Sequence, residues 1–135
     1  MSDYKGGCLC GSVRYTLAQA PVATMVCHCT HCQKSTGTAF SVVALVPEPA
    51  FECTGELKTY ADMGDSGNAV SRSFCPNCGS PVTTTAMTLP GMVIVKAGTF
   101  DDTSWLQPSA EIFCASSQSW VPHVEGAAHH ARMPG

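Results

Sequence analysis

The stretch Cys75-Pro76-Asn77-Cys78-Gly79 has the sequence of a zinc knuckle, a tight turn that directs two thiolates at one metal ion. Pro76 presets φ, and Gly79 accepts a positive φ without steric cost. Backbone N–H groups in such a turn face the sulfurs. A second, tighter pair lies in Gly7-Cys8-Leu9-Cys10-Gly11. Cys8, Cys10, Cys75 and Cys78 together would form a closed structural site for one zinc ion.

A third group of cysteines lies in Cys27-His28-Cys29-Thr30-His31-Cys32. Three protein ligands with one open position are typical of a catalytic zinc site. We therefore predict that Cys27, Cys29 and Cys32 hold a second zinc ion and form the catalytic centre. Two alternatives stay open. Cys53, Cys114, His28 or His31 could close this site and make it structural, or the three thiols could serve redox chemistry or metal buffering.

The chain has nine cysteines, an odd number that disfavours a framework of disulfides. No segment resembles a secretory signal, and no apolar run is long enough to span a membrane. We therefore expect a cytoplasmic protein whose thiols stay reduced and bind metal. The sequence leaves the oligomeric state open.

Short β-branched and apolar runs, separated by Gly, Pro, Asn and Asp, predict an all-β fold with many turns. The expected strands cover residues 13–17, 40–46, 57–60, 69–74, 81–85, 92–97 and 111–114. A short helical turn is expected over 30–36, and a hairpin turn or loop over 63–68. We expect one zinc domain over residues 1–125 of the 135, followed by a loose C-terminal tail over 126–135.

The charge of the chain argues against nucleic-acid binding. The formal net charge is −3, and the seven Lys and Arg residues are scattered rather than gathered in a basic patch. Charged residues make up only 13%, which also argues against a disordered or coiled-coil chain.

The order and spacing of the cysteine motifs resemble those of the glutathione-dependent formaldehyde-activating enzyme (GFA) family, which includes centromere protein V-like proteins. The matching segments are Gly7-Cys8-Leu9-Cys10-Gly11-Ser12-Val13-Arg14-Tyr15, Cys27-His28-Cys29-Thr30-His31-Cys32-Gln33-Lys34-Ser35-Thr36-Gly37 and Phe74-Cys75-Pro76-Asn77-Cys78-Gly79-Ser80, with Trp120 as a closing tryptophan. The resemblance implies a small zinc-stabilised domain of folded antiparallel sheets, described as Mss4-like. It also implies a structural zinc on Cys8, Cys10, Cys75 and Cys78 and a second zinc on Cys27, Cys29 and Cys32.

The same resemblance implies a zinc-dependent carbon–sulfur lyase that joins a thiol to a small aldehyde. Its partners would be glutathione and formaldehyde, as in an S-(hydroxymethyl)glutathione synthase. The alternatives are a non-catalytic zinc-stabilised binding module and a thiol redox or metal-buffering protein. The sequence identifies no residue that binds glutathione.

Two histidines lie between the predicted ligands. His28 and His31 could act as a general base or orient the substrate. We favour the alternative that they point to solvent or donate to a backbone carbonyl, because a C-x-C turn sends its middle side chain away from the metal. Lys34 and Arg72 could meet a substrate carboxylate, but ordinary surface charge is the favoured interpretation.

The remaining distinctive residues have simpler interpretations. Cys53 and Cys114 are expected to be small buried hydrophobes, since free cysteine is often buried. Trp105 and Trp120 are expected to pack in the core or at its edge rather than line a pocket. His129 and His130 are expected to lie in the solvated tail.

Overall fold

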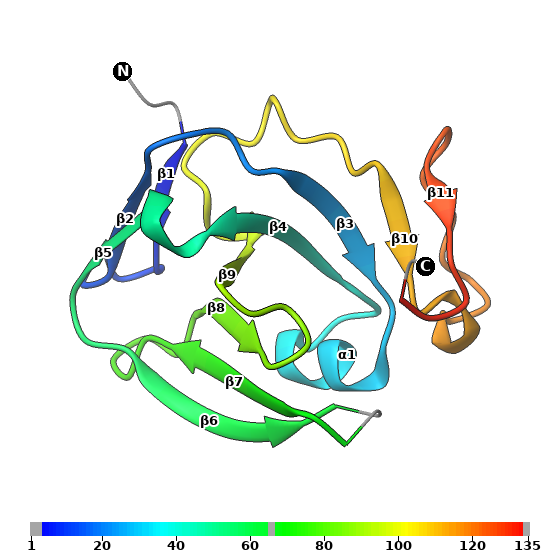
Figure 1. The fold of residues 1–135 in the computed structure, drawn as a ribbon, viewed down its shortest axis with the longest axis horizontal. Helices are drawn as coiled ribbons and strands as arrows, with labels where there is room; N and C mark the ends of the chain where they lie inside the picture. Colours follow the sequence, from blue (N-terminus) through cyan, green and yellow to red (C-terminus); the bar gives the residue numbers. More distant parts are fainter. Residues whose placement is uncertain (1–3, 65–66, 134–135) are drawn as a thin grey trace.

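The computed structural model describes residues 4–64 and 67–133 of the chain. Over these residues the protein is mostly β-sheet with one short α-helix, which confirms the predicted all-β class (Figure 1). The strands are β1 (Lys5–Gly7), β2 (Arg14–Leu17), β3 (Ala23–Cys27), β4 (Ser41–Pro47), β5 (Phe51–Thr54), β6 (Lys58–Met63), β7 (Ala69–Phe74), β8 (Pro81–Ala86), β9 (Met92–Lys96), β10 (Ala110–Ile112) and β11 (Ala128–His129). The helix is α1 (Thr30–Thr36), and 3₁₀ turns cover Glu48–Ala50, Ala97–Thr99 and Cys114–Ser116.

The strands form a small sheet and a large one. The small sheet has the order β1-β2-β5, and the large sheet has the order β11-β10-β3-β4-β9-β8-β7-β6. Neighbouring strands are antiparallel, as expected, except that β10 runs parallel to both β3 and β11. The large sheet is strongly curved, and α1 lies inside the curve (Figure 1).

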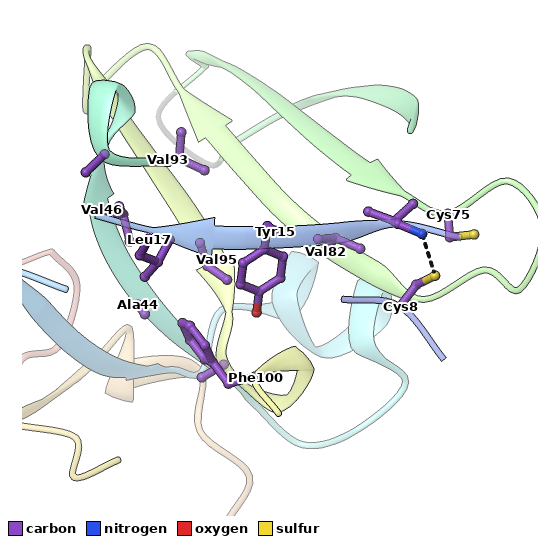
Figure 2. Close-up of a cluster of buried hydrophobic side chains, with 13 residues drawn as sticks. Cys8, Tyr15, Leu17, Ala44, Val46, Cys75, Val82, Val93, Val95 and Phe100 are labelled. Carbon is purple, nitrogen blue, oxygen red and sulfur yellow. Dashed lines mark hydrogen bonds between the residues drawn. The ribbon is translucent and has the colours of Figure 1, made fainter. Parts of the chain in front are cut away.

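The main core fills the space between the two sheets. Figure 2 shows Tyr15 and Leu17 of β2 beside Ala44 of β4 and Val95 of β9, and all four side chains are buried. Successive side chains of a strand point to opposite faces, so only every second residue of β4 and β9 enters this core. At one end of the core lie Cys8 and Cys75, where the small sheet meets the turn between β7 and β8 (Figure 2).

The opposite face of the large sheet carries a second, smaller apolar cluster. In β3, β4 and β9 the cross-strand pairs Met25–Val43 and Leu45–Ile94 lie on this face. Cys27 follows Met25 on the same face and belongs to the same cluster. The curve of the sheet therefore places the Cys27–Cys32 segment over an apolar surface that is separate from the main core.

The C-terminal segment differs from the expected loose tail. Ala128 and His129 form β11, which pairs with β10. Further backbone N–H groups donate to this segment: Phe113 donates to the carbonyl of Arg132, and Cys114 to that of His130. These backbone hydrogen bonds hold the segment against β10, which its Ala-, His- and Gly-rich composition did not indicate. Pro134 and Gly135 lie outside the described residues.

The expected hairpin turn over 63–68 joins β6 to β7, with Met63 opposite Ala69. The N–H of Gly64 donates to the carbonyl of Asn68 at 2.9 Å. Asp65 and Ser66 lie outside the described residues. Within the described residues, no helix is both long and apolar enough to span a membrane.

Candidate functional site

The structure brings Cys8, Cys10, Cys75 and Cys78 together, with all four sulfurs within 4.8 Å of one another. The Sγ atoms of Cys8 and Cys10 are 3.6 Å apart, and those of Cys10 and Cys75 are 3.8 Å apart. Sulfurs at the corners of a tetrahedron around zinc, with bonds of about 2.3 Å, lie about 3.8 Å apart. The four cysteines therefore have the donor type and spacing of a site that could hold a metal ion.

Backbone geometry prepares this cluster for thiolates. Gly79 has φ of 81°, as the knuckle motif requires. The N–H groups of Asn77 and Cys78 donate to Cys75 Sγ, and that of Val13 donates to Cys8 Sγ at 3.3 Å. Hydrogen bonds to the charged form favour it. The Ser80 hydroxyl and N–H thus lower the pKa of Cys78 to about 5.

Cys27, Cys29 and Cys32 form a second cluster with their sulfurs within 4.8 Å of one another. Cys27 ends β3, Cys29 is the N-cap of α1, and Cys32 lies in the first turn of the helix. The N–H of Cys32 donates to Cys29 Sγ at 3.3 Å, and Cys32 Sγ lies 3.3 Å from Cys27 Sγ. The chain passes directly from strand β3 into helix α1, and this sharp change of direction brings the three thiols together.

A cavity of about 540 Å³ opens beside the second cluster and is lined by all three of its cysteines. The first cluster differs, because four protein sulfurs already surround its centre. The described residues place no fourth protein ligand within the second cluster. Its free side therefore faces a space large enough for a small molecule.

A buried lysine lies next to the second cluster. Lys96 of β9 is 6% exposed, and its Nζ donates to Ser41 Oγ at 2.9 Å. Ser41 is the cross-strand partner of Cys27, so the ammonium lies close to the sulfurs and lines the same cavity. Burial lowers the pKa of Lys96, while the nearby cysteines act in the opposite direction.

Two residues of the cavity lining, His31 and Arg72, are joined by the carboxylate of Asp62, which lies outside that lining. Asp62 Oδ2 accepts hydrogen bonds from Arg72 Nε and His31 Nδ1, each at 2.8 Å. His31 and Arg72 hold the pKa of Asp62 well below its usual range. Arg72 was expected to be ordinary surface charge, but its side chain is only 14% exposed and lines the cavity. That expectation is wrong for Arg72, whereas Lys34 is exposed as expected.

His28 does not point to solvent or to a backbone carbonyl, as the favoured interpretation held. Its side chain is fully buried, and its Nε2 lies 2.7 Å from Glu111 Oε1. As expected, His28 does face away from the three sulfurs, but its side chain points into the protein interior and not to solvent. His31 also differs, because it pairs with the carboxylate of Asp62.

Glu111 is the centre of a third group of possible metal ligands, formed with His28, Cys114 and His123. His123 Nδ1 lies 2.9 Å from Glu111 Oε1, and the N–H of Val124 donates to Glu111 Oε2 at 2.6 Å. Although burial favours the neutral acid, hydrogen bonds from His123, His28 and Val124 lower the pKa of Glu111. This group could hold a metal ion, but its contacts are those of a hydrogen-bonded network that anchors the C-terminal segment.

Five other residues with expected roles can be compared with their observed positions. His129 is 45% exposed, yet its Nε2 lies 3.2 Å from Glu111 Oε2, so it is more than solvated tail. Cys53 and Cys114 are only partly buried. Trp105 packs on the main core as expected, but Trp120 is 69% exposed and donates to Gln118. The expectation of core packing is therefore wrong for Trp120.

The chain is similar to known proteins in sequence and in fold. A family model for the GFA family, the glutathione-dependent formaldehyde-activating enzymes, matches residues 3–116. The chain belongs to this family. A protein of Phaeosphaeria nodorum is 30% identical over 121 residues, covering 84% of this chain and 63% of its own length. A protein of Podospora anserina is 27% identical over 122 residues, covering 84% of this chain and 57% of its own length.

Both fungal relatives are named, provisionally, as glutathione-dependent formaldehyde-activating enzymes. This GFA-family chain spans only about three fifths of their length, 63% and 57% respectively. A crystal structure of a Rhodobacter sphaeroides protein superposes with a TM-score of 0.58 at 21% identity, over 77% of this chain and 91% of that one. At that identity the similarity supports the fold alone.

Sequence reasoning missed Asp62, Lys96 and Glu111. Lys96 had one visible signal, because it follows the apolar residues of β9 at a position that alternation assigns to the sheet face of Cys27. Asp62 and Glu111 had none, since each meets its histidine across a large separation in sequence.

Proposed function

We propose that this protein is a zinc-dependent carbon–sulfur lyase that joins a thiol to a small aldehyde. The observation that carries this proposal is the position of Cys27, Cys29 and Cys32. Their three sulfurs converge at one edge of a cavity of about 540 Å³ that leaves their fourth side free.

The donor set fits zinc, because three thiolates and one exchangeable position match a catalytic zinc site. Zinc held by Cys27, Cys29 and Cys32 would bind a substrate sulfur and keep it deprotonated at neutral pH. Cys8, Cys10, Cys75 and Cys78 would hold the second, structural zinc of the proposed domain over residues 1–125.

The proposed reaction is a balanced addition. The substrate sulfur forms a bond to the aldehyde carbon, the carbonyl electron pair moves to oxygen, and the proton that the thiol lost is taken up by that oxygen. No oxidant is needed, and the reverse reaction breaks the carbon–sulfur bond.

Lys96 would act on the developing negative charge. Its buried ammonium, fixed by Ser41, lines the cavity that the three sulfurs also line. A cation fixed in a site shielded from water stabilises an alkoxide more strongly than water does. Arg72, fixed by Asp62, would add a second positive charge to the same wall.

Family membership supports glutathione and formaldehyde as the first pair to test. The names of the fungal relatives refer to the same two compounds. All nine cysteines are free thiols, which suits the reducing cytoplasm that we propose as the compartment.

Exchange spectroscopy tests the proposal. NMR of zinc-loaded protein with glutathione and formaldehyde should show exchange between free and S-hydroxymethyl glutathione that is faster than without protein. Cys29→Ser should abolish the acceleration, and Cys53→Ser, which changes a cysteine outside the three clusters, should leave it intact. Equal exchange rates with and without zinc-loaded protein, for glutathione and for alkyl thiols alike, would contradict the proposal.

A further inference from the structure

The cavity beside Cys27, Cys29 and Cys32 has walls made mostly of hydrocarbon. Six strands contribute apolar side chains to it, among them Met25, Val43, Leu45, Val70, Ile94 and Ile112. The sheet register makes them continuous, because Met25 lies opposite Val43 and Leu45 opposite Ile94. An apolar surface across β3, β4 and β9 therefore leads away from the sulfurs.

The described part of the chain does not cover this apolar surface completely. Met25, Val43 and Ile112 are buried, whereas Leu45 and Ile94 at the far end are only partly buried. Their neighbours along the strands, Ala44 and Val95, are fully buried in the main core on the opposite face. Because apolar surface gains free energy when it leaves water, a ligand with a hydrocarbon body would bind favourably here.

The charged side chains that line the cavity are basic within the described residues, and one of them, Arg72, is paired with Asp62 outside the lining. Among the described residues that line the cavity, the charged side chains are Arg72, Lys96 and Arg132, and none is Asp or Glu. A carboxylate on the ligand would find a cation here, whereas an ammonium group would find no carboxylate among the described residues of the lining. Glutathione carries an ammonium group, two carboxylates and two amides, which the hydrocarbon walls cannot satisfy.

We propose that the substrate thiol is an alkyl or aryl thiol with a single carboxylate, and that glutathione is a poor ligand. The sulfur would lie at Cys27, Cys29 and Cys32, and the hydrocarbon would follow the Met25–Val43 and Leu45–Ile94 pairs. That the ligand is a thiol rests on the proposed function. The class of thiol differs from glutathione, which the family name suggests.

Two thiols that differ only in chain length give the direct test. 3-Mercaptopropionate and 6-mercaptohexanoate are both primary alkyl thiols with one carboxylate, and so have the same charge. The second compound is longer by three methylene groups. Each methylene that is fully buried strengthens binding by roughly fourfold. Cobalt-substituted protein reports binding directly, through the absorption of cobalt when a further thiolate coordinates it.

The longer thiol should bind at least about fivefold more tightly than the shorter one, and both should bind more tightly than glutathione. A smaller ratio, or tighter binding of glutathione than of 6-mercaptohexanoate, overturns the proposal. Val70→Thr keeps the shape of the side chain but adds a hydroxyl to the cavity wall, so it should reduce the ratio. Val22→Thr is the matched control, because Val22 is 58% exposed and lies outside the cavity lining. An equal ratio in both variants overturns the proposal.

The binding measurement separates this inference from the proposed reaction. If 6-mercaptohexanoate binds preferentially but no thiol–aldehyde exchange is accelerated, the substrate class stands and the lyase function fails. If exchange is accelerated only with glutathione, the lyase function stands and the substrate class fails. If no thiol changes the cobalt absorption, both fail.

Discussion

His28 Nε2 lies 2.7 Å from Glu111 Oε1, and both side chains are buried. This contact connects the turn that carries Cys27 and Cys29 to β10. Through His123 and the N–H of Val124, the same carboxylate also holds the C-terminal segment. One buried carboxylate thus connects the candidate catalytic loop with a part of the chain that lies outside the cysteine motifs.

Replacing this carboxylate should therefore be costly. Glu111→Ala leaves His28 and the N–H of Val124 without their partner, and we expect a loss of about 3 kcal/mol in the free energy of unfolding. Urea unfolding of the metal-loaded protein, followed by circular dichroism, measures the change. Glu125→Ala removes an exposed carboxylate and should change stability by less than about 0.5 kcal/mol. Equal stability of the two variants would show that the Glu111 network is dispensable.

The two cysteine clusters should respond differently to the same substitution. Cys78→Ser removes a ligand of the closed cluster and should abolish cooperative folding, since structural zinc contributes roughly 10 kcal/mol of binding free energy to the folded state. Cys29→Ser should leave the fold intact, because the closed cluster survives. Amide NMR spectra of both variants test this. Loss of dispersed signals in Cys29→Ser would show that the second cluster is structural.

Metal removal should occur in two stages. A metallochromic chelator should take one zinc ion per chain rapidly and the second at least about a hundredfold more slowly, because one site has an exchangeable position and the other is closed. Absorbance of the chelator complex gives both rates. Release of both ions at one rate would argue that both sites are closed or both are open.

Lys96 should affect the reaction more than the fold. Lys96→Met removes the buried ammonium but keeps much of its hydrocarbon, and we expect kcat/KM to fall about a hundredfold. Thermal unfolding should show that the variant remains folded. Lys58→Met, which changes an exposed lysine of β6, serves as the control. If both variants keep full activity, the alkoxide is stabilised by another group.

The sequence alone predicted much of the sheet and the grouping of the cysteines. Strands such as β4 and β9 are long apolar runs, and cysteine pairs around turns have few alternative uses in a reducing compartment. Strands β1, β3, β5 and β11 were missed. The strands β1 and β11 are short, and the glycines in Lys5–Gly7 and the alanine and histidine in Ala128–His129 are not typical of strands. The strands β3 (Ala23–Cys27) and β5 (Phe51–Thr54) are also short, although both contain residues that favour strands.

The hydrogen-bond partners of the polar residues around the site could not be predicted from the sequence. Glu111 and His28 are 83 positions apart, and Asp62 and His31 are 31 positions apart. Carboxylates and histidines are common on surfaces, so their type carries little information without the fold. The curvature of the large sheet, which no local pattern encodes, brings Arg72 and Lys96 to the cavity that contains the sulfurs.

The central claim is that Cys27, Cys29 and Cys32 hold zinc with one open position. Anomalous diffraction at the zinc edge, from crystals grown with and without a thiol ligand, tests it most directly. The account predicts two zinc peaks, one bonded to four cysteine sulfurs and the other to Cys27, Cys29 and Cys32 with the added sulfur as fourth ligand. A single peak at the first cluster, or a second zinc closed by a fourth protein side chain, would contradict it.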